Sequence, residues 1–215
     1  MNMNADDYQY WSKKADRYDA ATTYIVGAKA LEAANSWLKH QLSATDVALE
    51  LGCGTGYFSC EIALRVQDLT ATDMSQEMLT RAQARLQAYP NVKVECADGY
   101  RTQYSEQSFD LVFMGNLVHI VQEPVVVLQE SHRLLKSGGQ LVLIDFTMSG
   151  MSGIARLAMM LRYLSRYGLP QRTNKSYGLS ELAALVQGVK FEIRDAQMIS
   201  RETNVLCLCA AKWEG

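Results

Sequence analysis

The chain has 215 residues, of which 48% are hydrophobic and 20% charged, and its formal net charge is −2. This length and balance indicate one globular domain, and the slight acidity argues against bulk electrostatic attraction to nucleic acid. The N-terminus lacks the pattern of a signal peptide, and no run reaches the roughly 18 apolar residues of a membrane-spanning helix. Five cysteines without a CxxC pair predict reduced thiols in a cytoplasmic protein.

Residues 1–46 are predicted to be mainly helical, because apolar residues recur at near-helical spacing between Ala28 and Leu42. From residue 47 onward, short apolar runs alternate with helical patterns. Five runs predict strands, at residues 47–51, 68–72, 92–96, 109–114 and 139–146. Helices are expected over 75–89 and from residue 123 to a stop at Gly138 and Gly139. This alternation predicts an α/β protein with a mostly parallel sheet and helices on both faces.

After Phe146 the pattern changes. Residues 147–180 are long for a connection, and we expect them to form a helical insertion over the carboxyl ends of the strands, where such sheets bind ligands. An apolar stripe within it comprises Ile154, Leu157, Leu161 and Leu164. Three arginines accompany the stripe, and basic amphipathic helices also lie on membranes, so membrane contact through 151–167 stays an alternative.

The last part of the chain predicts a short helix at 179–186 and two strands at 189–199 and 204–213. Only four residues separate these strands, which is too short for a parallel crossover. We therefore expect an antiparallel hairpin at the edge of the sheet.

The run ELGCGTGYFS, residues 50–59, joins the first strand to a helix and carries three glycines. Such a turn brings the backbone close to a ligand. A triphosphate loop would need a lysine that is absent here, and a dinucleotide loop would have its third glycine where Tyr57 stands. Glu50 precedes Gly52 by two residues and would repel a pyrophosphate but attract a cation.

Asp73 follows the second strand, 21 residues beyond Gly52, where an acidic side chain can accept hydrogen bonds from both ribose hydroxyls. The expected ligand therefore has a ribose, a positive end and no phosphate. S-adenosylmethionine (SAM), with its sulfonium and ammonium groups, has these features.

Five segments resemble the motifs of class I SAM-dependent methyltransferases, in family order. ELGCGTG is similar to the motif that binds the methionine part of SAM, ATDMS to the ribose motif and ECADGY to the adenine-edge motif. FDLVFMGNLVHIV and RLLKSGGQLVLIDF resemble the motifs of strands four and five. The likeness is to the small-molecule branch that includes quinone-biosynthesis enzymes. It implies a single Rossmann-like domain with seven strands and an antiparallel C-terminal hairpin.

The resemblance also implies site residues. Its cofactor set is Tyr18, Glu50, Gly52, Cys53, Gly54, Gly56, Asp73, Met74, Asp98, Gly99 and Asn116. His119 lies where the family faces the transferred methyl group, as an acceptor contact or general base, or as a merely packed side chain. Tyr10 is a candidate acceptor contact, residues 1–46 a lid and 147–180 a cover for the acceptor. His132 is expected to be solvated.

The expected reaction is in-line transfer of a methyl group from SAM to a small molecule, at an oxygen, nitrogen, carbon or sulfur atom. The [ND]PP[YFW] signature of nucleic-acid amino-methyltransferases is absent after strand four, where GNLVH stands, so no nucleic-acid partner is expected. No metal is expected either. An NAD(P)-dependent oxidoreductase and a non-catalytic SAM-binding protein remain alternatives, and the oligomeric state stays open.

Overall fold

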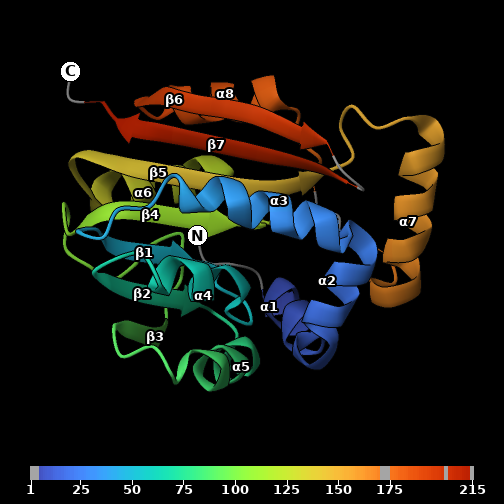
Figure 1. The fold of residues 1–215 in the computed structure, drawn as a ribbon, viewed down its shortest axis with the longest axis horizontal. Helices are drawn as coiled ribbons and strands as arrows, with labels where there is room; N and C mark the ends of the chain where they lie inside the picture. Colours follow the sequence, from blue (N-terminus) through green and yellow to red (C-terminus); the bar gives the residue numbers. More distant parts are fainter. Residues whose placement is uncertain (1–4, 170–174, 201–202, 214–215) are drawn as a thin grey trace.

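The computed structural model describes residues 5–169, 175–200 and 203–213, and its seven strands form one sheet in the order β3-β2-β1-β4-β5-β7-β6 (Figure 1). The strands are β1 Val47–Leu51, β2 Asp68–Asp73, β3 Val92–Cys96, β4 Phe109–Gly115, β5 Leu135–Thr147, β6 Phe191–Ser200 and β7 Asn204–Lys212. β1 to β5 pair in parallel, whereas β7 is antiparallel to both β5 and β6. The predicted mostly parallel sheet with a C-terminal edge hairpin is confirmed.

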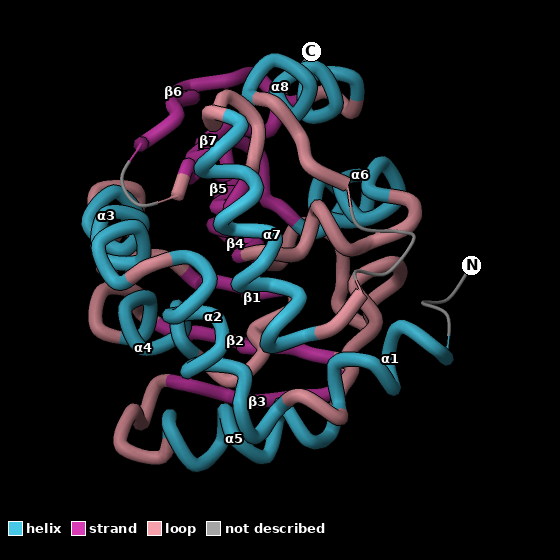
Figure 2. The backbone as a smooth tube through the Cα atoms, turned by 90° about the vertical axis from the view of Figure 1, so that its right-hand side faces the viewer, coloured by secondary structure: helices cyan, strands magenta, loops and turns pink. Residues whose placement is uncertain are grey.

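Helices pack on both faces of this sheet, as Figure 2 shows end-on. They are α1 Ala5–Ser12, α2 Tyr18–Val26, α3 Ala28–Lys39, α4 Tyr57–Ala63, α5 Gln76–Leu86, α6 Pro124–Leu134, α7 Gly153–Tyr167 and α8 Leu179–Gly188. α3, α4 and α5 share one apolar core with the sheet, while α6 and α8 bury their apolar sides in the core on the other face. The remaining helices, α1, α2 and α7, lie beside the carboxyl ends of β1 to β5 (Figure 1).

The end of α6 differs from the prediction. The helix stops at Leu134 rather than at Gly138, because Leu135 already pairs with Phe109 of β4. Lys136 Nζ is 2.8 Å from the Asp110 carboxylate, which fixes the extended chain there. Gly138, with φ of +71°, lies in the irregular stretch where the β4–β5 register shifts. The two glycines therefore shape a bulge in β5 instead of a helix end.

α7 lies at one end of the molecule, beside α2 (Figures 1 and 2). Its first turn is capped by Ser152, whose Oγ accepts a hydrogen bond from the Ala155 amide at 3.3 Å. Three of the four residues of the apolar stripe are exposed, Ile154 by 85%, Leu157 by 59% and Leu161 by 58%, whereas Leu164 is half-buried. Met159 and Tyr167 are buried instead. Within the described residues, no helix has both the length and the apolar character to cross a bilayer.

Two smaller expectations have different outcomes. The five cysteines are all unpaired, in agreement with the reduced thiols predicted from the sequence. His132 was expected to be solvated, and this is wrong: it is half-buried, with its ring centroid 5.2 Å from that of Phe191. Burial and the nearby charges of Lys212 and Lys190 lower its pKa. Cytoplasmic location stays a prediction.

Candidate functional site

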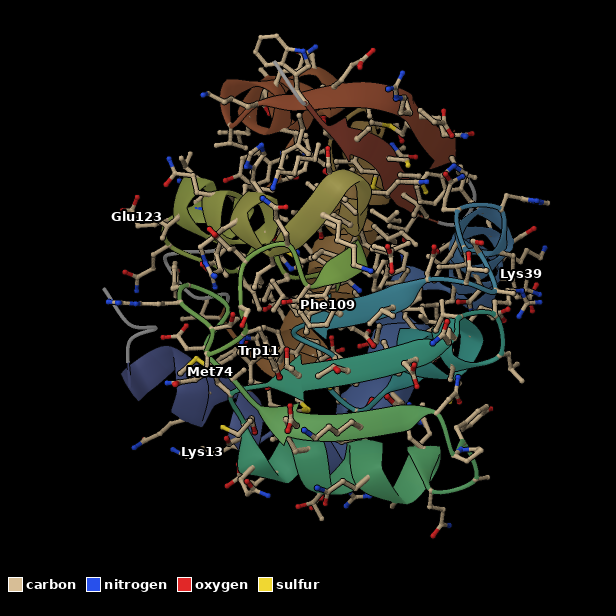
Figure 3. All side chains as sticks on the ribbon, turned by 90° about the vertical axis from the view of Figure 1, so that its left-hand side faces the viewer. Trp11, Lys13, Lys39, Met74, Phe109 and Glu123 are labelled. Atoms are coloured by element: carbon tan, nitrogen blue, oxygen red, sulfur yellow. The ribbon has the colours of Figure 1, made fainter. Side chains whose placement is uncertain are left out.

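Two neighbouring cavities lie at the carboxyl ends of the parallel strands, and they share lining residues from α2, from the glycine loop that follows β1, and from the end of β4. Of the predicted site residues, the larger cavity is lined by Tyr18, Gly52, Gly54, Asp73, Met74, Asp98, Gly99, Asn116 and His119. The smaller is lined by Tyr18, Glu50, Gly52, Cys53, Gly54 and Asn116. Figure 3 labels Trp11 and Met74, which both line the larger cavity. Gly56 and Tyr10 line neither.

The glycine loop is shaped by backbone conformation and held by β2. Gly52 has φ of +72°, and a Cβ atom there would lie 2.9 Å from Leu117 Cδ1, so no other residue fits without movement. The Cys53 amide donates to the Thr72 carbonyl at 2.8 Å. The Gly54 amide donates to Asp73 Oδ2 at 2.9 Å. The loop therefore has a fixed shape beside the end of β2.

Asp73 connects the loop to α5 while facing the larger cavity. Its Oδ1 accepts a hydrogen bond from the Ser75 amide at 2.8 Å, and Ser75 rather than Asp73 caps the helix. Burial raises the pKa of Asp73, and its bonds to backbone amides oppose that rise. A carboxylate has about four acceptor sites, so two backbone bonds leave capacity for ribose hydroxyls.

Glu50 is a buried carboxyl group at the smaller cavity, with 1% of its surface exposed. Its Oε2 accepts a hydrogen bond from Ser59 Oγ at 2.5 Å. Burial raises the pKa of Glu50 to about 7, although the Ser59 bond opposes this and the charge of Asp73 adds to it. A cation bound beside Glu50 would favour the ionised form and reverse this shift.

α2 is fastened over the glycine loop through Asp19. Thr55 Oγ1 donates to Asp19 Oδ1 at 2.5 Å, and the Arg85 guanidinium of α5 pairs with the other carboxylate oxygen. Tyr18, the preceding residue, borders both cavities and stacks on Tyr167 of α7 with ring centroids 6.5 Å apart. Residues of α2 thus form a wall common to the two cavities.

Asp98 and Asn116 line the larger cavity, and the side chain of each also accepts a hydrogen bond from a backbone amide. Asp98 Oδ1 accepts a hydrogen bond from the Tyr100 amide at 2.9 Å, which closes the turn after β3. Asn116 is left-handed, with φ of +58°, and its Oδ1 accepts from the Phe146 amide at 3.2 Å. The bond joins the ends of β4 and β5.

His119 forms a pair with Asp145 at the rim of β5. His119 Nδ1 is 2.5 Å from Asp145 Oδ1, and the His119 amide donates to Asp145 Oδ2 at 3.2 Å. Burial opposes the charged imidazole, but the buried Asp145 carboxylate outweighs it and raises the pKa of His119. With Nδ1 bound to Asp145, Nε2 is the nitrogen left for a ligand in the cavity that His119 lines. The signal for Asp145 was a lone carboxylate in the apolar run LVLIDF.

The aromatic wall of the larger cavity was not predicted in full. It consists of Trp11, Tyr18, Phe146, Tyr163 and Tyr167. Tyr163 and Tyr167 follow Met159 at intervals of four, the helical spacing that would have identified this inner side of α7. Tyr10 supports the wall from behind, because its hydroxyl bonds with the Tyr163 hydroxyl at 3.1 Å.

The charge of the site fits SAM. Among the described residues that line the two cavities, the acidic ones are Asp19, Glu50, Asp73 and Asp98, and neither lining contains Lys or Arg. Buried carboxylates favour a cationic ligand over a phosphorylated one.

Comparisons with known proteins agree with this geometry. A family model described as a methyltransferase domain matches residues 49–143. A demethylmenaquinone methyltransferase of Lysinibacillus sphaericus is 25% identical to this chain. The alignment covers 76% of this chain and 70% of the relative's length. The chain is a class I SAM-dependent methyltransferase.

Two further proteins place this methyltransferase among its relatives. A carboxy-S-adenosyl-L-methionine synthase of Helicobacter pylori is 28% identical over 81% of this chain and 79% of its own. The structure of a SAM-dependent methyltransferase from Thermotoga maritima superposes with a TM-score of 0.74 at 17% identity, covering 95% of this chain and 99% of that one. The superposition confirms the predicted Rossmann-like fold, and the methyltransferase family match supports the predicted SAM cofactor.

Proposed function

We propose that the enzyme methylates an uncharged, hydroxylated aromatic small molecule. The observation that carries this proposal is the His119–Asp145 pair, 2.5 Å between Nδ1 and Oδ1, in a cavity with an aromatic wall. A planar ring packs well against aromatic side chains, and a nearby imidazole can take a proton from a hydroxyl group. The carboxylates at the cofactor side make an anionic acceptor a poorer fit.

On the cofactor side, Glu50 binds the ammonium group, and the glycine loop with Cys53 surrounds the methionine chain. The other predicted contacts are Asp73 to the ribose, Met74, Asp98 and Gly99 to the adenine, and Asn116 and Tyr18 between the two ends. When bound, SAM supplies a methyl group already activated on a sulfonium. Residues 1–46 and 147–180 act as lid and acceptor cover; residues 1–4 and 170–174 of these segments lie outside the described part.

On the acceptor side, His119 donates through Nδ1 to Asp145 and receives the acceptor's hydroxyl proton at Nε2. The aromatic wall would hold the acceptor ring in place, and its proximity to the methyl group that bound SAM would supply contributes to catalysis. Ionisation of the hydroxyl also activates the neighbouring ring carbon. Carbon methylation is therefore the second candidate, and the likeness to demethylmenaquinone methyltransferases favours an acceptor ring of the quinone class.

The test is a panel of phenols and hydroquinones, each paired with its counterpart lacking the hydroxyl group, incubated with methyl-labelled SAM and the full chain. We expect label in the hydroxylated compounds only, with S-adenosylhomocysteine as co-product. Fragmentation by tandem mass spectrometry then distinguishes oxygen from carbon methylation. Equal labelling of the counterparts, or labelling of amines alone, would refute the proposal.

A further inference from the structure

α7 has an apolar side that nothing in the described structure covers. Ile154 is 85% exposed, Leu157 59%, Met160 46% and Leu161 58%, and Leu169 just beyond the helix is 81% exposed. These five make up half of the large hydrophobic residues that are exposed in the described part of the chain. A cluster of this kind on one helix marks an interaction surface, unlike single scattered apolar residues.

The opposite side of the same helix is already in use. Met159, Tyr163 and Tyr167 line the larger cavity, and Met159 and Tyr167 are buried. α7 therefore separates the larger cavity from an exposed apolar strip, defined here as Ile154, Leu157, Met160 and Leu161. Figure 2 shows this helix facing outward at the end of the molecule, in front of the sheet.

Charge around the strip is one-sided. Residues 147–178 contain five of the 21 basic residues of the chain and none of its 23 acidic residues. The rest of this slightly acidic protein therefore carries all of the negative charge. Such asymmetry indicates attraction of this segment to an anionic surface.

The arginines of α7 flank the strip. At about 100° per residue, Arg156 falls next to Met160 on one edge, and Arg162 falls beyond Ile154 on the other. Arg162 donates to the Tyr24 carbonyl at 3.3 Å, and the Arg166 guanidinium lies 4.4 Å from the centroid of the Tyr24 ring. These contacts orient α7 on α2 without pairing either guanidinium with a carboxylate among the described residues.

We propose that this side of α7 docks on the surface of a lipid bilayer that contains anionic headgroups. Aliphatic side chains between flanking arginines match a helix lying in the plane of the headgroups, with its apolar side toward the acyl chains. A symmetric second copy fits less well, because it would bring the arginines of two copies together with no acidic residue of 147–178 between them. A nucleic acid would favour aromatic side chains for stacking, whereas the strip is aliphatic.

The test is flotation of the full chain with vesicles made of equal parts phosphatidylcholine and phosphatidylglycerol, compared with phosphatidylcholine alone. We expect binding to the anionic vesicles to exceed binding to neutral ones by about tenfold or more, and to fall when salt is raised to about 0.5 M. Leu157→Ser with Leu161→Ser should abolish flotation, because both side chains are exposed and their loss costs the fold little.

The matched control is Leu64→Ser. Leu64 is 65% exposed just after α4, away from α7, and this variant should float like the unchanged protein. Equal binding to both vesicle types, no binding, or the same loss in the Leu64 variant would overturn the proposal. So would a concentration-dependent dimer in sedimentation velocity that the Leu157/Leu161 variant dissociates, because the strip would then pair with a second copy.

Discussion

Replacing Glu50 by Gln should stabilise the free protein and weaken cofactor binding at the same time. Glutamine has the shape of the protonated carboxyl and can still accept the bond from Ser59 Oγ, which is 2.5 Å long in the structure. It cannot carry the charge that we assign to the ammonium group. The variant thus separates two effects of the buried carboxylate, its destabilisation of the folded protein and its proposed attraction for the ammonium group.

The size of the stability effect follows from the pKa. Burial raises the pKa of Glu50 from 4.5 to about 7, so at about 1.4 kcal/mol per pH unit the folded state gives up about 3 kcal/mol when this group is ionised. Because the folded pKa is the higher one, the protein is relatively stabilised below pH 4.5 and loses that contribution as pH rises to about 7. Glu50→Gln should therefore raise the melting temperature at pH 8 by about 6 to 12 °C, with little change near pH 4.5.

The binding effect has the opposite sign. S-adenosylhomocysteine retains the ammonium group, so its affinity should fall as Glu50 becomes protonated. With a pKa of about 7, the dissociation constant should rise about tenfold between pH 8 and pH 6 through this group. Isothermal titration calorimetry of the unchanged protein and of Glu50→Gln, at both pH values, measures the slope and its loss.

The reasoning is refuted by either of two results. If Glu50→Gln melts lower than the unchanged protein at pH 8 while circular dichroism shows an intact fold, the carboxylate is not a cost to the free protein. If the variant binds S-adenosylhomocysteine equally well at pH 8, the carboxylate does not face the ammonium group.

Three further outcomes are expected. Asp73→Asn should weaken S-adenosylhomocysteine binding about tenfold or more, since ribose bonds to a charged acceptor are worth about 1.5 to 3 kcal/mol; unchanged affinity in calorimetry would contradict this. The rate of methyl transfer should rise with pH through a midpoint above 6.5, the ordinary pKa of His119, and Asp145→Asn should move that midpoint down; an unmoved midpoint would remove Asp145 from its positioning role. Asp19→Asn should speed dissociation of S-adenosylhomocysteine in stopped flow, by loosening α2 from Thr55; an unchanged rate would show that α2 does not limit release.

Local patterns predicted the sheet and the glycine loop well, because both depend on residues close together in sequence. Three local features were enough for this prediction. They are the apolar run before Gly52, the spacing from Gly52 to Asp73, and the short turn of the final hairpin. The end of α6 was not predicted correctly, because Leu135 pairs with Phe109 of β4. This partner is 26 residues away, so no local pattern reveals it.

The acceptor side was predicted less completely for a related reason. Asp145 is remote from His119 in sequence, and their pairing depends on β4 and β5 being neighbours. In α7, the helical period allowed either an Ile154–Leu157–Leu161 side or a Met159–Tyr163–Tyr167 side to face inward. Only the packing of α7 against α2 selects the second.

The wall shared by the two cavities has a thermodynamic consequence. The Tyr167 hydroxyl donates to the Tyr18 carbonyl at 3.2 Å, so a residue that lines only the larger cavity holds one that lines both cavities. A ligand that orders Tyr18 therefore lowers the entropy cost of binding for a second ligand that also contacts Tyr18. By linkage, the factor by which the cofactor tightens the acceptor must equal the factor by which the acceptor tightens the cofactor. In the proposed arrangement, the methyl donor and the acceptor would thus each raise the affinity of the other through Tyr18.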